Sequence, residues 1–93
     1  MRLSKKEIAK IKSIIESIFD NPTIYLFGSR LKNIKKGGDI DLYVISKDNK
    51  NLYEKKIKAI AKLENELKKP VDIVVHKDFN RTIEQEALKG EIL

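Results

Sequence analysis

The sequence predicts an α+β fold of two layers, in which helices pack on a small sheet of about three strands. Three patterns predict it. Apolar residues recur at helical spacing, short runs of β-branched and aromatic residues lie between the helical stretches, and Pro, Gly or Asn mark the breaks. A chain of 93 residues buries only about 60–65% of its unfolded surface, enough for one modest core. We therefore expect one domain over residues 1–93.

The first predicted helix starts with a capping box, in which the side chains of Ser4 and Glu7 bond each other's free backbone N–H groups. It ends before Pro22, which biases the residue before it away from the helical conformation. Its apolar stripe is formed by Ile8, Ile11, Ile15 and Ile18.

Two more helices are predicted. Asn51 to Glu54 repeats the capping-box pattern at the head of the second helix. The last helix spans about Asn80 to Lys89, with Asn80 as its cap and Gly90 just beyond its end. The stripe predicted for the second helix is Tyr53, Ile57, Ile60, Leu63 and Leu67.

The predicted strands cover residues 23–27, 39–46 and 71–76. In the second strand, Ile40, Leu42 and Val44 form the more apolar side, which should face the helices. The other side of the same strand carries the two aspartates. In the third strand, alternation places Asp72 and His76 on one side.

The composition indicates which kinds of partner and chemistry to expect. The net charge of +6, from 20 Lys and Arg against 14 Asp and Glu, favours anionic partners. Only three of the cations are Arg, and exposed aromatic clusters are not evident, so we do not expect direct nucleic-acid binding. The absence of Cys excludes disulfides, thiolate zinc sites and a cysteine nucleophile. No apolar run approaches the ~20 residues of a membrane span, and we expect a cytoplasmic protein without a membrane partner.

The stretch from Gly28 to Asp41 carries the predicted chemistry. Asp39 and Asp41 lie at alternate strand positions, so they share a face with Cα atoms about 6.6 Å apart. Two carboxylates so close repel each other unless a cation lies between them. Gly28 lets a phosphate approach the backbone, Ser29 can cap a turn whose N–H groups bind that phosphate, and Arg30 can add a charge-assisted contact. The stretch predicts a divalent metal site beside a phosphate-binding turn.

Asp72 interrupts an apolar strand, where an unpaired buried carboxylate would cost several kcal/mol. If this strand lies beside the second one, Asp72 can join Asp39 and Asp41. Three carboxylates can hold two Mg²⁺ ions about 3.5–4 Å apart, an arrangement that serves in-line phosphoryl displacement. Asp72, alone or with Asp41, can also accept a proton from an attacking hydroxyl.

Simpler interpretations compete with these. Asp39 and Asp41 could be solvated on an edge strand, although Asp is depleted in strands. Asp72 could pair with a lysine, and Arg30 with a surface acid. Ser29 could be an ordinary helix cap, which is compatible with phosphate binding. For Tyr43 packing is the simpler role, and for His76 a structural one; neither is assigned to the site.

Gly28-Ser29, then Asp39-Ile40-Asp41-Leu42, and later Val71-Asp72-Ile73-Val74, resemble the DNA polymerase beta nucleotidyltransferase superfamily. Within it, a short chain of this kind looks like the minimal nucleotidyltransferase (MNT) group, to which the MntA-type antitoxins belong. The resemblance covers nearly the whole chain.

The resemblance implies a mixed sheet with helices on one face and the aspartates on the other. It implies transfer of a nucleoside monophosphate, AMP from ATP as the first choice, with release of pyrophosphate. Gly28 and Ser29 would contact the triphosphate, Asp39 and Asp41 would bind both metals, and Asp72 would be the third carboxylate. It also implies a partner, a HEPN-type toxin that the chain would modify as a protein adenylyltransferase.

Two other functions stay open. The chain could be a module that masks its partner without catalysis. It could also be a nucleotidyltransferase subunit that acts on a small hydroxyl-bearing molecule and needs a second domain or a dimer to complete its cleft.

Overall fold

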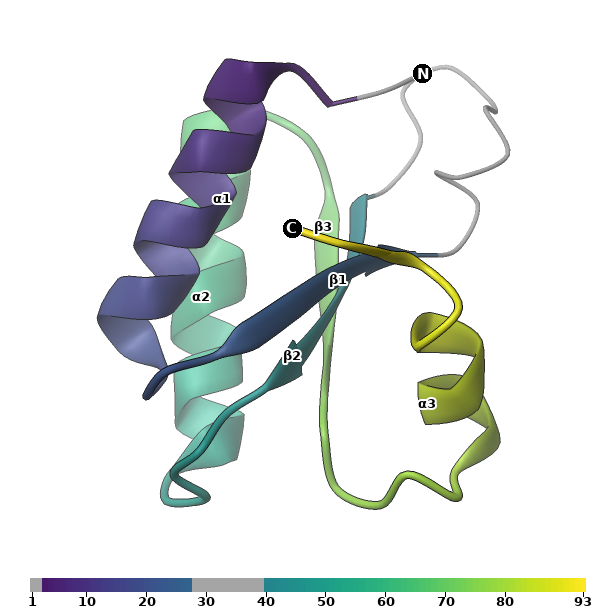
Figure 1. Cartoon of the computed structure of the whole chain (residues 1–93). Coiled ribbons are helices and arrows are strands. Elements are labelled where there is room, and N and C mark those ends of the chain that lie inside the picture. The colour runs from purple at the N-terminus through teal and green to yellow at the C-terminus, as the bar shows by residue number, and fades with distance from the viewer. Residues whose placement is uncertain (1–2, 28–39) are drawn as a thin grey trace.

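A four-stranded sheet in the order β3-β2-β1-β4 forms the centre of the molecule (Figure 1). This computed structural model describes residues 3–27 and 40–93. Along the chain the elements are α1 (Lys5–Ile18), β1 (Thr23–Phe27), β2 (Ile40–Ile45), α2 (Leu52–Leu67), β3 (Val71–Val75), α3 (Thr82–Ala87) and β4 (Glu91–Ile92).

The sheet is mixed. β1 pairs antiparallel with both β2 and β4, whereas β2 and β3 run parallel. The α+β class, the mixed sheet and the three predicted strands are confirmed. β4 is an addition to that prediction, because two residues are too few to show an alternating pattern.

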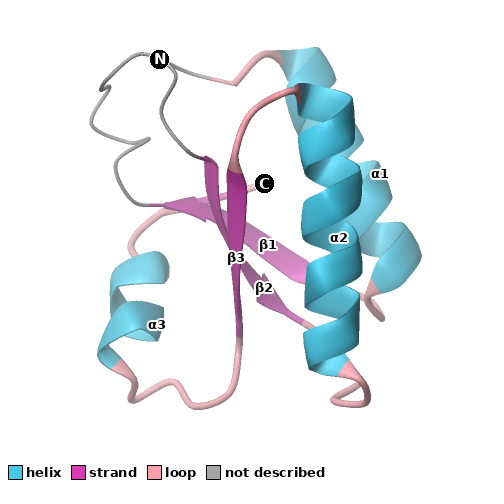
Figure 2. Ribbon diagram, turned by 180° about the vertical axis from the view of Figure 1, so that it is seen from behind, coloured by secondary structure: helices cyan, strands magenta, loops and turns pink. Residues whose placement is uncertain are grey.

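Helices α1 and α2 lie side by side on one face of the sheet (Figure 2). They cover the apolar side of each strand, as the alternation predicts, and the residues with no exposed surface include Ile40, Leu42, Val44 and Ile73. The stripe of α1 is confirmed in its centre, where Ile11 and Ile15 are fully buried. This face holds the larger of two apolar clusters.

The opposite face carries α3, so the helices do not all lie on one side of the sheet. Ala87 of α3 packs with Phe27 and Tyr43, which point away from α1 and α2. This short helix covers aromatic side chains that the second face of the sheet would otherwise expose to water.

The helix starts follow the predictions in part. The Ser4 and Glu7 capping box is present, with both hydrogen bonds formed. The second capping box is wrong: Asn51 has φ 53° and ψ 36° and makes no side-chain cap bond, whereas a capping residue needs extended backbone. Helix α3 is shorter than predicted, and its cap is Arg81 rather than Asn80.

The predicted stripe of α2 is wrong at its N-terminal end. Tyr53 and Ile57 are exposed, while Ala59, Leu63 and Leu67 are buried. Tyr53 and Ile57 are one turn apart, and they lie to the side of the face that contacts the sheet.

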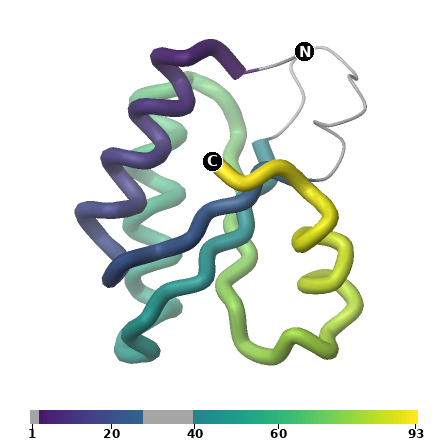
Figure 3. The backbone as a smooth tube through the Cα atoms, in the orientation of Figure 1, coloured from purple at the N-terminus to yellow at the C-terminus, as the bar shows by residue number. Residues whose placement is uncertain are grey.

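After α3 the chain returns to the sheet (Figure 3), where β4 pairs with β1. Gly90 lies between α3 and β4. A Cβ atom at this position would lie 2.2 Å from the backbone oxygen of Leu26 and 2.8 Å from Cβ of Phe27. The residue is therefore needed for a close approach to β1 rather than as the predicted end of a helix.

Among residues 3–27 and 40–93, none of the helices combines the length and the hydrophobicity of a membrane-spanning segment.

Candidate active site

The predicted site residues divide into two groups. Gly28, Ser29, Arg30 and Asp39 lie outside the described residues. Asp41 and Asp72 lie within them, on β2 and β3. The described residues stop at Phe27, which is paired with Asp41, and resume at Ile40.

Asp41 and Asp72 are paired in register on neighbouring parallel strands. Strands in a sheet are about 4.8 Å apart, and residues in register point to the same face. The condition set by the sequence, that the third strand must lie beside the second, is met. Two carboxylates from different parts of the chain are thus neighbours on one face of the sheet.

Both carboxylates lie on the face that carries α3. Asp41 is half-buried and Asp72 is exposed. One oxygen of Asp72 accepts the N–H of Ile73 at 3.0 Å. Within residues 3–27 and 40–93, Asp72 forms no ion pair with a lysine, so the simpler role considered for it is not observed.

The donor set suits a hard cation. Carboxylate oxygens are the ligands that Mg²⁺ prefers, and it usually takes only one or two of them from the protein. No group of three potential metal ligands occurs among the described residues. Asp39, which the sequence pairs with Asp41 in the predicted metal site, is outside them.

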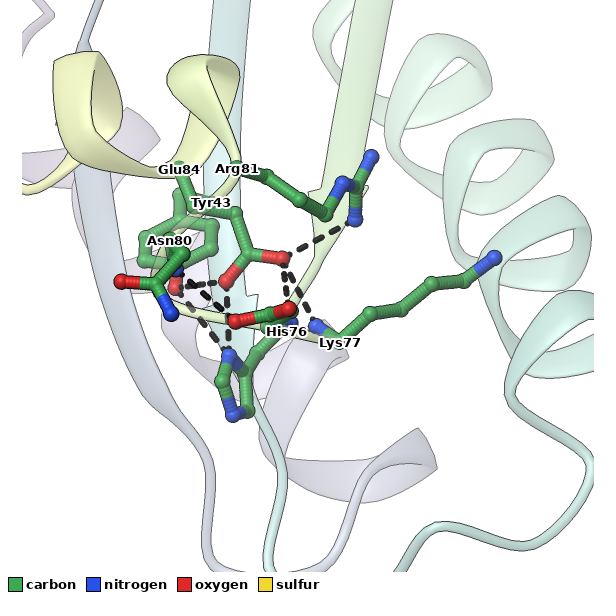
Figure 4. A network of polar contacts seen from close by, with 7 residues as sticks. Tyr43, His76, Lys77, Asn80, Arg81 and Glu84 are labelled. Carbon is green, nitrogen blue, oxygen red and sulfur yellow. Dashed lines mark hydrogen bonds and ion pairs between the residues drawn. The ribbon is translucent and has the colours of Figure 1, made fainter.

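The same face of the sheet contains a buried polar network around Glu84 (Figure 4). Glu84 has no exposed surface, and five hydrogen bonds converge on its carboxylate. The donors are the Tyr43 hydroxyl at 2.7 Å, His76 Nδ1 at 2.7 Å, the Lys77 and Asp78 N–H groups at 2.8 and 2.9 Å, and Arg81 at 2.9 Å.

These bonds decide the charge of Glu84. Burial alone would raise its pKa, but the N–H of Asp78, the hydroxyl of Tyr43 and the remaining donors outweigh burial and lower the pKa to about 2. An ionised carboxylate can only accept, so Nδ1 of His76 carries the hydrogen. Burial and the adjacent Glu84 raise the pKa of Tyr43 well above its usual value.

The network fixes the strand that carries Asp41. Tyr43 follows Asp41 by two residues and shares its face, about 6.8 Å along the strand. The tyrosine is fully buried and tied to α3 through Glu84. Packing, the role expected for Tyr43, is confirmed, and His76 has a structural partner.

Sequence reasoning missed Glu84. Its position on a short, weakly patterned helix gave no sign of burial. One signal was available, because alternation places Tyr43 on the side of Asp41 in the second strand and His76 on the side of Asp72 in the third, and both need polar partners when buried.

Carboxylates that lie in register on adjacent strands of a small mixed sheet are suited to hold a divalent cation for phosphoryl transfer. The chain belongs to the family described as Polymerase beta, Nucleotidyltransferase, whose profile matches residues 9–93.

Two solved structures are similar to this chain. One is a crystal structure of a toxin-antitoxin with AMP-PNP, with a TM-score of 0.73 and 23% identity, over 95% of this chain and 69% of that one. The other is a mutant of the toxin-antitoxin MntA-HpeT, with a TM-score of 0.68 and 21% identity, over 98% of this chain and 71% of that one. At these identities the likeness shows the fold. Among curated proteins, none matches the sequence significantly.

Proposed function

We propose that this nucleotidyltransferase domain transfers AMP from ATP to a partner protein, in a Mg²⁺-dependent reaction, and that the partner is a HEPN-type toxin. The observation that carries the catalytic part is the register of Asp41 with Asp72. The partner is supported by the two similar structures, which are toxin-antitoxin structures.

The proposed roles divide along the chain. Gly28, Ser29 and Arg30 contact the triphosphate. Asp39, Asp41 and Asp72 hold two Mg²⁺ ions, which supply charge stabilisation for the phosphoryl group when bound. These assignments match the chemistry of each residue, since N–H groups and a guanidinium bind phosphate and carboxylates bind hard cations.

The transfer exchanges one bond at phosphorus and moves one proton. The acceptor hydroxyl oxygen bonds the α-phosphorus of ATP, the bond from that phosphorus to the bridging oxygen breaks, and pyrophosphate leaves. The hydroxyl proton passes to a carboxylate. Asp72 is suited to this role because it is exposed and has no ion pair within the described part of the chain.

Transfer from α-labelled ATP tests the proposal. With Mg²⁺ and the candidate partner, we expect label on the partner. Asp41→Asn and Asp72→Asn should each reduce the rate about a hundredfold or more, since each removes roughly 3 kcal/mol of transition-state stabilisation. Asp20→Asn, at an exposed position outside the sheet, is the matched control and should keep full activity.

Three outcomes would contradict the proposal. Equal labelling by wild type and both aspartate variants would remove the catalytic assignment. Neutralisation of the toxin in cells by the Asp41→Asn/Asp72→Asn variant, without transfer, would favour the masking module. Label on a small molecule in the absence of any partner would favour the small-molecule enzyme.

A further inference from the structure

The outer edge of β3 is open over part of its length. Ile40 donates to the Pro70 carbonyl at 3.0 Å and His76 donates to the Val44 carbonyl at 2.9 Å, so residues 70 and 76 face β2. In a parallel pair alternate residues bond the same neighbour. The N–H and C=O groups of Val71, Ile73 and Val75 therefore point away from the sheet.

Carboxylate side chains already accept two of the three outward N–H groups of this edge. The N–H of Val71 donates to Glu64 Oε2 at 2.8 Å, and the N–H of Ile73 donates to Asp72 Oδ1 at 3.0 Å. Within residues 3–27 and 40–93, no acceptor is bonded to the N–H of Val75. The free donor thus lies at the end of β3 that is farther from Asp72.

A groove of about 200 Å³ lies at that end, and its lining residues come from α2, from β3 and from the segment that leads into α3. Its lining includes Tyr53 and Lys56 of α2, Val75 of β3 with Lys77 just beyond it, and Arg81 and Ile83 at the start of α3. Tyr53 is 73% and Ile83 41% exposed.

The groove is cationic. Lys56 and Lys77 form no ion pair with the described residues, and Arg81 uses Nη1 alone for Glu84, which leaves other N–H donors available. Exposed apolar side chains, lysines without an ion pair in the described part of the chain and a free N–H on the strand edge together match a strand whose apolar side chains alternate with carboxylates.

We propose that this groove, defined by Tyr53, Lys56, Val75, Lys77, Arg81 and Ile83, docks an extended acidic segment of a partner protein as an added strand beside β3. Val75 lies three residues, about 10 Å, from Asp72 along the strand. A segment that accepts the N–H of Val75 finds no free N–H at Ile73, because that group is bonded to Asp72. The segment therefore leaves the strand edge there, and its next residues reach the face of the sheet that carries Asp41 and Asp72. That last step rests on the proposed function; the docking does not.

A peptide titration without nucleotide or metal tests the docking separately from transfer. The probe is a short synthetic peptide in which glutamate alternates with valine, and the comparison peptide carries lysine for glutamate. We expect the acidic peptide to shift the amide signals of Tyr53, Val75 and Lys77 in NMR spectra. At saturation, hydrogen exchange of the Val75 amide should slow about tenfold or more, because that N–H gains an acceptor.

Charge reversal provides the matched variants. Lys56→Glu/Lys77→Glu should weaken binding of the acidic peptide about tenfold or more. Lys5→Glu/Lys62→Glu changes the net charge equally at exposed positions outside the groove, and should stay within about twofold of wild type. Tyr53→Ser/Ile83→Ser, which alters only exposed side chains, should also weaken binding.

Four results would overturn the proposal. They are no shifts at millimolar acidic peptide, equal binding of the basic peptide, equal weakening by both charge-reversal pairs, and unchanged Val75 exchange in the bound state. If the same signals shift when the protein alone is concentrated, the occupant is a second copy of the chain, and the proposed partner is wrong.

Discussion

Glu84 is a fully buried side chain that stays charged because five donors surround it. It connects Tyr43 on β2, His76 beyond β3 and Arg81 at the start of α3. A buried carboxylate is retained at low cost only when all of its acceptor sites are filled. This residue therefore fixes α3 on the sheet, two positions along β2 from Asp41.

The pKa of Glu84 gives a pH dependence of known sign. Its pKa falls from 4.5 in an ordinary environment to about 2 in the fold, so it contributes about 3 kcal/mol to the free energy of unfolding above pH 5. That contribution is lost as pH falls from about 5 towards 2. In urea unfolding, Glu84→Gln should be less stable than wild type at pH 7 and should lose less stability over this interval.

The control for Glu84→Gln is Glu86→Gln, on the same helix but exposed. It should unfold like wild type at every pH. A Glu84→Gln variant that loses as much stability as wild type between pH 5 and pH 2 would contradict the assigned role of the carboxylate.

At the scale of single residues, the sequence predicted the positions of Asp41 and Asp72 but not the burial of Glu84. Asp41 and Asp72 stand out because strands disfavour aspartate, and their alternation fixes the face on which they lie. Glu84 resembles any other glutamate of a charged helix, since its burial depends on partners from β2 and from the segment after β3. Such non-local partners leave no local pattern.

Among the elements, β4 depends on the absence of a side chain at residue 90. Its pairing with Tyr25 and Leu26 of β1 requires the chain to pass over the Leu26 carbonyl at Gly90. The N–H of Leu93 continues the contact by donating to the Ile24 carbonyl at 2.8 Å. One methyl group is enough to obstruct this path.

Gly90→Ala should therefore weaken the attachment of β4. We expect a loss of roughly 1–3 kcal/mol in the free energy of unfolding, typical of overpacking against a backbone that cannot move freely. The amide of Leu93 should exchange faster with solvent. Lys89→Ala, at the exposed neighbouring position, should change neither quantity, and normal Leu93 protection in Gly90→Ala would show that the obstruction is absent.

The elements themselves were largely predictable, and their ends were not. Helix α1 and strands β1 to β3 follow from apolar spacing and alternation. The start of α2 could not be predicted in this way, because a capping pattern at Asn51 does not reveal the left-handed backbone conformation of that residue. The stripe that included Tyr53 and Ile57 failed for a related reason: both fit helical spacing but lie beside the contact face.

For the whole molecule, the net charge of +6 favours anionic ligands. If ATP with Mg²⁺ binds the folded chain alone, it must stabilise it: at one hundred times Kd the gain is about 2.7 kcal/mol. For a domain of this size that corresponds to a rise in Tm of roughly 10 °C or more.

Thermal unfolding measures this effect directly. EDTA should remove most of the rise, and Asp41→Asn/Asp72→Asn should reduce it in the presence of Mg²⁺, because both act on the same cation. An equal rise with and without EDTA would mean that ATP binds through the basic surface and not at the aspartates.

The strand order has a consequence for how the chain folds. β1 is paired on one side with β2 and on the other with β4, which lies at the far end of the described sequence. Pairings between distant segments form slowly, because a long loop must close first. Until Glu91 and Ile92 pair with it, β1 is a second open edge beside that of β3, so a folding intermediate of this protein would also be prone to cleavage and aggregation at the strand that leads to Gly28.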